Sequence, residues 1–274
     1  MPKLDIGVLV TLNENPDAEI SRVSRFGLKS CQVCSWNPEI WSDENGKKLV
    51  EACTTYGVKV STFWAGYTGP VVWNFIEGPR TIGLVPEQYR AQRVKELKQA
   101  ADFAAKFGLP SITTHVGFLP EDPNDELYIG TVKALKEIVS HCKELGIDFL
   151  FETGQETPVT LLRTIEQIGL DNSGINLDTA NVILYGKGNP VDSLDVFGKY
   201  VKDLHIKDGC FPTCGDELGK QVQLGEGKVD FKAVIAGLKK LGYSGPLTIE
   251  RECGDGEEQT RDIKAAIEML EPLR

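Results

Sequence analysis

Short apolar runs recur along the chain, and each is followed by a break and then by a longer amphipathic stretch. Runs of this length that are rich in Val, Ile, Leu and Phe are typical of buried strands. The pattern predicts eight strands, at residues 4–10, 29–36, 58–64, 110–117, 147–152, 174–180, 201–208 and 245–252.

Helical spacing marks stretches between these runs. Apolar residues repeat every three or four positions within residues 94–104, 132–142, 231–241 and 263–270. Gly108, Gly146 and Gly242 follow the first three stretches as stop signals, and Asp230 is placed to cap the third helix.

The alternation of strands and helices predicts a parallel sheet, and eight such units predict a single (β/α)8 TIM barrel over residues 1–274. No Pro/Ser linker, charge block or low-complexity tract divides the chain. An open doubly wound sheet is the alternative fold. It is less favoured because no Gly-rich dinucleotide loop follows the first strand.

Two connections are much longer than the rest, at residues 65–85 and 209–227. Both follow strands, so both are expected at the carboxyl-terminal mouth of the barrel, where barrel enzymes carry their chemistry. Connections of this length are commonly functional. We interpret them as candidate covers for a substrate.

Composition narrows the function classes. The formal net charge of −10 argues against a nucleic-acid partner, although acidic clusters can hold a divalent cation. The amino terminus does not resemble a signal peptide, and no apolar run reaches the roughly 18 residues of a membrane helix. The sequence therefore predicts a cytoplasmic protein without a membrane partner.

The seven cysteines do not predict a metal site. An odd number without an export signal suggests reduced thiols. Cys31 and Cys34 form a CxxC motif, but it lies in a strand-like run. Positions i and i+3 of a strand face opposite sides, which argues against joint ligation by this pair.

Four consecutive predicted strands end with a side chain that can bind a metal: Glu152, Asp178, His205 and Glu250. In a barrel these ends lie side by side around one mouth. Three carboxylates gathered there would repel one another unless a cation lay among them. Each acid alone could instead cap a helix or pair with Lys207 or Arg251, but four successive strands favour a shared site.

Several segments resemble the xylose isomerase-like TIM barrels, the sugar phosphate isomerase/epimerase group. They are THVG, FLFETG, NLDTAN, DLHIKD and especially LGEGKVDFKAVIAGLKKLGYSGPLTIE, and the resemblance is strongest from Thr114 to Glu252. Within this group, the chain resembles the ketose 3-epimerases and the inosose dehydratases. The resemblance implies an enzyme acting on a small-molecule sugar.

The resemblance implies that Glu152, Asp178, His205 and Glu250 hold one divalent metal ion. Mn, Mg, Co and Zn all suit such ligands. It also implies that Glu152 and Glu250 act as the catalytic acid and base, interconverting a keto-sugar or sugar derivative through an enediolate.

Six further residues are candidate substrate contacts: His115, Lys207, Glu156, Asn181, Trp36 and Trp64. Lys207 shares strand parity with His205 and can point inward, although a salt bridge to Glu250 or Asp178 is an equal alternative. Core packing alone would account for either tryptophan.

The substrate residues of ketose 3-epimerases are not retained. The positions of their His, Arg and Glu hold Asn181, Phe211 and Pro158 here, with Glu156 near the last. A metal-dependent dehydratase or lyase acting on an inosose or 3-keto-sugar therefore stays open, as does a non-catalytic sugar-binding barrel. A DNA-cutting zinc enzyme of the same fold is disfavoured by the acidic charge and the three histidines. A homo-oligomer is possible, and the sugar, its phosphorylation and the native metal stay open.

Overall fold

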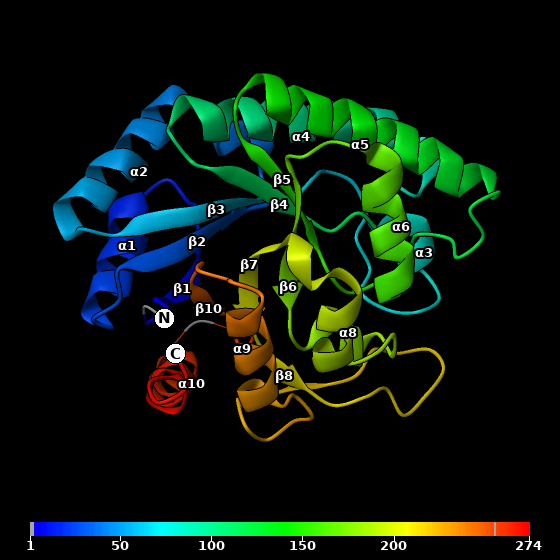
Figure 1. Ribbon diagram of the computed structural model, residues 1–274. Coiled ribbons are helices and arrows are strands. Elements are labelled where there is room, and N and C mark those ends of the chain that lie inside the picture. The colour runs from blue at the N-terminus through cyan, green and yellow to red at the C-terminus, as the bar shows by residue number, and fades with distance from the viewer. Residues whose placement is uncertain (1–2, 255) are drawn as a thin grey trace.

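Eight parallel strands close into a barrel in the computed structural model, which describes residues 3–254 and 256–274 (Figure 1). The order around the barrel is β1-β10-β7-β6-β5-β4-β3-β2. The strands are Ile6–Thr11 (β1), Ser30–Ser35 (β2), Lys59–Ala65 (β3), Ser111–Thr114 (β4), Asp148–Glu152 (β5), Ser173–Asp178 (β6), Val201–Ile206 (β7) and Leu247–Ile249 (β10). This closed barrel rules out the open doubly wound sheet.

Helices follow the strands and cover the outside of the barrel (Figure 1). They are Pro16–Arg25 (α1), Asp43–Tyr56 (α2), Gly78–Thr81 (α3), Glu87–Lys106 (α4), Glu126–Glu144 (α5), Pro158–Ile168 (α6), Asn181–Leu184 (α7), Pro190–Phe197 (α8), Phe231–Lys240 (α9) and Glu257–Leu270 (α10). Short 3-10 turns lie at Pro38–Ile40 and Gly198–Tyr200.

All eight predicted strands are confirmed, with ends that differ from the predicted ones by up to a few residues. The predicted helix signals are confirmed as well. Gly108, Gly146 and Gly242 adopt positive φ angles of 72°, 76° and 82°, a conformation that glycine tolerates at a helix end. The Asp230 side chain accepts a hydrogen bond from the Ala233 amide at 2.9 Å and caps α9.

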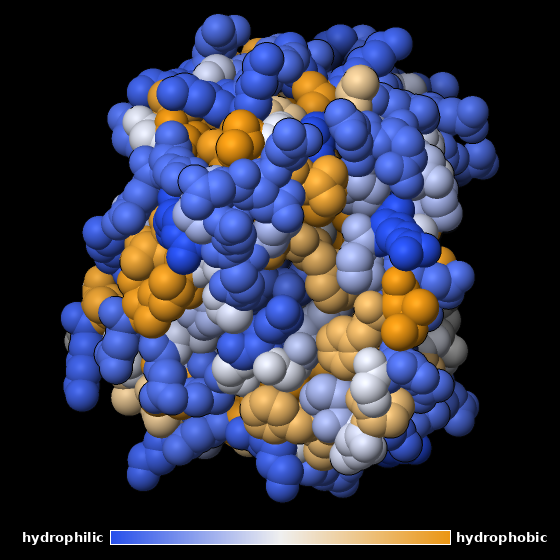
Figure 2. All heavy atoms as spheres, turned by 90° about the vertical axis from the view of Figure 1, so that its right-hand side faces the viewer, coloured by the Kyte–Doolittle hydropathy of each residue, from blue (hydrophilic) through white to orange (hydrophobic). Residues whose placement is uncertain are grey.

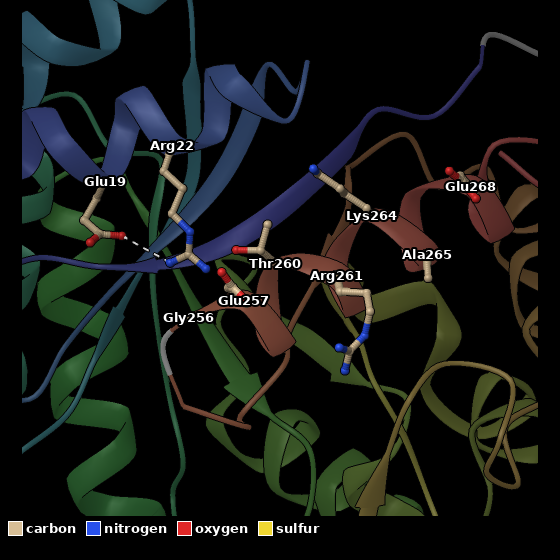
Figure 3. A pocket seen from close by; sticks show the side chains of 9 residues that line it. All are labelled: Glu19, Arg22, Gly256, Glu257, Thr260, Arg261, Lys264, Ala265 and Glu268. Carbon is tan, nitrogen blue, oxygen red and sulfur yellow. Dashed lines mark ion pairs between the residues drawn. The ribbon is translucent and has the colours of Figure 1, made fainter.

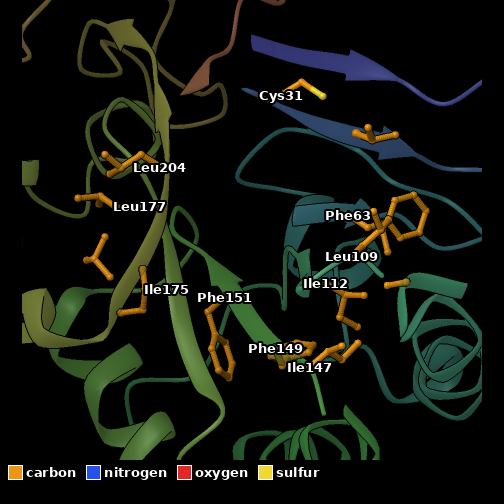
Figure 4. Packing of buried hydrophobic residues seen from close by; sticks show 14 of the residues in the cluster. Cys31, Phe63, Leu109, Ile112, Ile147, Phe149, Phe151, Ile175, Leu177 and Leu204 are labelled. Carbon is orange, nitrogen blue, oxygen red and sulfur yellow. The ribbon is translucent and has the colours of Figure 1, made fainter. Parts of the chain in front are cut away.

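The apolar core lies between the strands and the helices, while the barrel interior is polar. Gln32 on β2 donates to Asn176 on β6 at 2.8 Å, and these strands lie on opposite sides of the barrel. This bond runs through the interior, so the alternate residues Ile175 and Leu177 face the helices. Figure 4 shows them in the buried layer with Phe149. The residues that alternate with these apolar ones along each strand point into the barrel, and polar side chains occupy these inward positions.

The two long connections carry small elements of their own. Residues 65–85 include α3, and residues 209–227 include β9 (Gln221–Val222), which pairs antiparallel with β8 (Asp208–Gly209). The Phe75 amide donates to the Asp216 carbonyl at 3.0 Å and joins the two connections. Within the described residues, no helix is long and apolar enough to cross a membrane.

Candidate active site

The four strand-end residues predicted as metal ligands come together. One ligand atom from each of Glu152, Asp178, His205 and Glu250 lies within 4.8 Å of the others, and all four residues are buried. Their strands β5, β6, β7 and β10 are consecutive in the barrel. Asp178 pairs directly with His205 in the register of β6 and β7. We call these four residues the acid cluster.

His205 lies at the centre of the acid cluster. Its Nδ1 is 3.1 Å from Glu152 Oε1, 3.2 Å from Glu250 Oε2 and 3.8 Å from Asp178 Oδ2. The two glutamates stand at the two ends of the row of four strands. They therefore reach the space around Nδ1 from different sides.

Gln32 fixes which nitrogen of His205 faces the carboxylates. The Gln32 amide nitrogen donates to the Leu204 carbonyl at 3.3 Å, so its oxygen must face His205 Nε2, 2.7 Å away. That oxygen can only accept, so Nε2 carries a proton and Nδ1 is the nitrogen that faces the carboxylates. Sequence reasoning missed Gln32, because a polar residue in a strand gives no sign of its partner across a barrel.

Glu152 is held by neutral donors as well as by histidines. Its Oε2 accepts from the Trp64 indole N–H and from Asn176 at 3.4 Å. Its Oε1 accepts from Asn181 at 3.3 Å and lies 3.6 Å from His115 Nε2. Three of the predicted substrate contacts therefore touch a predicted metal ligand.

Burial and opposite charges set the ionisation of the acid cluster. Burial alone would raise the pKa of Glu250, but Lys207 and His205 hold it well below its usual range. The two histidines likewise keep the pKa of Glu152 low against the effect of burial. Burial lowers the pKa of His205, but Glu152 and Glu250 outweigh it and raise that pKa well above the ordinary value.

The surroundings of the Asp178 carboxylate indicate whether a cation fits the acid cluster. Its side chain is 0% exposed, and its Oδ2 has no hydrogen-bond partner. Burial raises the pKa of Asp178 well above its usual value, and the neighbouring glutamates add to the effect. Since a buried carboxylate oxygen without a hydrogen bond is costly, a divalent cation between Asp178 Oδ2 and its neighbours fits the donor set.

Lys207 points inward, as its strand parity predicts. Its Nζ lies 3.1 Å from Glu250 Oε2, 3.6 Å from Asp178 Oδ2 and 2.5 Å from Glu252 Oε2. Burial would lower the pKa of Lys207, but these carboxylates, led by Glu250, raise it well above its usual value. The salt bridges that were the alternative to a substrate role are thus present.

A cavity of about 590 Å³ opens above the acid cluster at the carboxyl ends of the strands. Figure 2 shows hydrophobic side chains gathered around a hollow on the side of the molecule where α3 lies. Glu152 and Glu250 lie on the cavity lining, together with the predicted contacts Trp36, Trp64, His115, Asn181 and Lys207.

Glu156 is the exception among the predicted site residues. It does not line this cavity and is 2% exposed, and neither carboxylate oxygen has a hydrogen-bond partner. Burial raises the pKa of Glu156 to about 8. At neutral pH its carboxyl group is therefore mostly protonated.

Both long connections wall the cavity, as their positions after strands predict. The first contributes Trp73 and the second contributes Leu218, Gly219 and Gln221. Trp73 was missed by sequence reasoning, because nothing in a loop sequence shows which side chain turns inward. Phe211, which takes the place of a family arginine, is exposed and is not among the lining residues.

The CxxC pair splits across the sheet. Cys31 is buried in the apolar core, whereas Cys34 lines the cavity. The two thiols therefore lie on opposite faces of β2, as the strand geometry predicts.

A larger hollow of about 840 Å³ lies between α1 and α10, outside the barrel (Figure 3). Its lining residues carry charges of both signs, and none of them is buried. Arg22 pairs with Glu19 at 3.8 Å on the same helix. This hollow lacks the buried, convergent polar groups of a catalytic site, so the cavity above the acid cluster is the stronger candidate for the active site.

The family model for the xylose isomerase-like TIM barrel matches residues 20–273. The chain belongs to this family. A solved xylose isomerase domain protein from Planctomyces limnophilus is 35% identical with a TM-score of 0.93, covering 100% of this chain and 98% of that one.

Less similar proteins share the fold or part of the sequence. A solved D-tagatose 3-epimerase-like protein has a TM-score of 0.76 at 21% identity, covering 98% of each chain. The inosose dehydratase of Lacticaseibacillus casei is 23% identical over 137 residues, which is 43% of this chain and 45% of that protein. The family resemblance drawn from the sequence is therefore confirmed.

Proposed function

We propose that the protein is a divalent-metal-dependent isomerase or epimerase of a small keto-sugar or sugar derivative. The observation that carries this proposal is the acid cluster, which gathers three buried carboxylates and one imidazole beneath an open cavity. The family membership and the fold shared with an epimerase-like protein support it.

Glu152, Asp178, His205 and Glu250 would hold the metal ion, with His205 ligating through Nδ1. When bound, the ion would supply Lewis acidity to the carbonyl oxygen of the sugar. Mn, Mg, Co and Zn all suit this donor set, so the set does not select among them.

Glu152 and Glu250 would transfer the protons. Both line the cavity from opposite ends of the four-strand row, and both pKa values are lowered, so each is available as a carboxylate base. One removes the proton from the carbon next to the carbonyl. The other, once protonated, returns a proton to that carbon or its neighbour.

The remaining polar side chains would position the sugar. Lys207 and Asn181 present donors on the cavity lining, within reach of substrate oxygens. His115 lies against Glu152, and Gln155 donates to its Nδ1 at 3.3 Å. Burial lowers the pKa of His115, so its neutral ring can donate from Nε2 without adding charge.

Incubation of a keto-sugar panel in D2O tests the proposal. Wild-type protein with Mn²⁺ should place deuterium on the carbon next to the carbonyl. Glu250→Gln should slow this exchange by about 10²- to 10⁴-fold, because a transferring carboxylate is lost. Glu166→Gln is the matched control, since Glu166 is an exposed residue of α6 that does not line the cavity. Equal exchange in Glu250→Gln and wild type would refute the role of Glu250.

A dehydratase is the second candidate, favoured by the partial match to an inosose dehydratase. The same proton abstraction would then be followed by loss of a leaving group from the neighbouring carbon. The D2O incubation separates the two activities. Deuterium gain without loss of water indicates an epimerase or isomerase, and an enone chromophore indicates a dehydratase.

A further inference from the structure

The turn after β5 holds a buried amide that contacts two residues of the cavity lining. Gln155 is 1% exposed, and its own side chain is not part of that lining. Its Nε2 donates to His115 Nδ1 at 3.3 Å and to the Tyr185 hydroxyl at 3.0 Å. His115 and Tyr185 directly follow β4 and α7, and both line the cavity. One amide nitrogen therefore joins two side chains that face the same cavity.

The contact with Gln155 fixes the tautomer of His115. An amide nitrogen can only donate, so His115 Nδ1 accepts and Nε2 carries the proton. The carboxylate of Glu152 favours the same tautomer, but its Oε1 is 3.6 Å from Nε2, which is too long for a hydrogen bond. Among the described residues, the Nε2 proton has no hydrogen-bond acceptor. This donor is therefore available to an oxygen of a bound sugar.

The same amide sets the direction of the Tyr185 hydroxyl. The hydroxyl oxygen accepts from Gln155, and no described residue accepts the hydroxyl proton. Burial raises the pKa of Tyr185 well above its ordinary value, so the phenol stays protonated at neutral pH. Tyr185 thus supplies a second neutral donor on the cavity lining.

Close packing holds the Tyr185 ring. Phe118 and Phe75 contact it edge-on, with ring centroids 5.7 Å and 6.5 Å away. A Cβ at Gly154 would lie 3.2 Å from the ring, so glycine lets the ring approach the backbone beside Gln155. The packing fixes the ring, and the Gln155 amide fixes the remaining rotation of the hydroxyl.

We propose, on the basis of the function proposed above, that Gln155 is a positioning residue and that Tyr185 is a further substrate-binding residue. Gln155 holds His115 and Tyr185 so that the Nε2 proton and the hydroxyl proton are donated to two oxygens of one sugar. Both donors are neutral, so they add no positive charge beside the proposed metal ion.

Nitrogen-15 NMR spectra of the histidine rings test the role of Gln155 without turnover. The chain has three histidines, and His115→Gln identifies the signals of His115. We expect the Nε2–H tautomer in wild type. Gln155→Met keeps a side chain of similar size but removes the donor, so it should shift the Nδ1 signal. The Nδ1–H tautomer in wild type would mean that the amide oxygen faces His115 instead, and it would overturn the inference, as would an unchanged Nδ1 signal in Gln155→Met.

Deuterium exchange from D2O into D-allulose, D-tagatose and D-fructose tests the role of Tyr185. For the sugar that wild type exchanges fastest, Tyr185→Phe should raise KM about three- to tenfold and change kcat by less than about twofold, because one neutral hydrogen bond to the sugar is lost. Gln155→Met should raise KM further, since it releases both donors. Adding Tyr185→Phe to Gln155→Met should then change KM by less than about twofold. Tyr128→Phe is the control, because this buried tyrosine accepts from Thr164 at 3.2 Å and does not line the cavity.

Two kinetic results would contradict the inference: an unchanged KM in Tyr185→Phe, and additive effects of the two substitutions in the double variant. If wild type with Mn²⁺ exchanges deuterium into none of the three sugars, the proposed function fails for these sugars instead. The histidine spectra then still decide whether Gln155 holds His115. Titration of wild type and Tyr185→Phe with D-allulose, followed by the same signals, decides whether Tyr185 binds the sugar.

Discussion

At the scale of single residues, Gln32 decides how His205 can act. Its carboxamide accepts from His205 Nε2 and leaves Nδ1 for the acid cluster. Gln32→Leu should weaken Mn²⁺ binding about 10- to 100-fold, as the loss of a group that orients a metal-ligating histidine typically does. Calorimetry measures the affinity. Gln32→Glu keeps an acceptor and should bind more tightly than Gln32→Leu; the reverse order would contradict this role.

Glu156 gives a prediction for stability against pH. Its pKa is raised to about 8 by burial, so the folded chain keeps this proton while the unfolded chain ionises near pH 4.5. The contribution of Glu156 to stability is full below about pH 4.5 and is lost as pH rises toward about 8. Glu156→Gln removes the ionisation. The free energy of unfolding of this variant, relative to that of wild type, should therefore increase by on the order of 4 kcal/mol from pH 4.5 to pH 8.

Urea unfolding at pH 5 and pH 8 measures this difference for Glu156. The exposed Glu166 on α6 offers a control, and Glu166→Gln should follow wild type at both pH values. If the free energies of unfolding of Glu156→Gln and wild type differ by the same amount at pH 5 and pH 8, Glu156 is not buried as described.

At the scale of elements, Asp208 organises the turn at residues 222–229. Its Oδ2 accepts from the Gly225 and Gly227 amides, each at 2.9 Å, and its Oδ1 accepts from Gly209 at 2.8 Å and Val229 at 3.2 Å. A Cβ at Gly227 would come within 2.1 Å of Asp208 Oδ1, so only glycine permits this approach. The GEG motif, residues 225–227, therefore binds the Asp208 carboxylate through two backbone amides.

Asp208→Asn should destabilise this turn and the chain, because an amide nitrogen would replace one of the two accepting oxygens. We expect a loss of about 2 kcal/mol and faster hydrogen exchange at the Gly225 and Gly227 amides. Glu226→Gln, an exposed change in the same turn, should leave both unchanged. Unaltered protection of the two glycine amides in Asp208→Asn would contradict the role of Asp208 in holding this turn.

At the scale of the whole molecule, the fold could be predicted because one pattern repeats. Buried strands and capped helices alternate, and Gly108 and Asp230 mark helix boundaries by local chemistry alone. The acid cluster could be predicted for the same reason, since strand order and parity bring Glu152, Asp178, His205 and Glu250 to one mouth.

The rest of the site depends on contacts that no local pattern encodes. Gln32 reaches His205 across the barrel, and Trp73 turns into the cavity from a long connection. Glu156 follows Glu152 by four residues, yet the turn after β5 buries it away from the cavity lining. Spacing in the sequence cannot show such choices, because tertiary packing sets them.

The metal content of the purified chain tests the central claim most directly. Wild type and Asp178→Asn would be equilibrated with Mn²⁺, separated from free ion by gel filtration and analysed by mass spectrometry. The acid cluster predicts about one ion per wild-type chain and a small fraction of that in folded Asp178→Asn, since a metal ligand is lost. A wild-type chain without bound ion, or equal occupancy in both proteins, would contradict the claim.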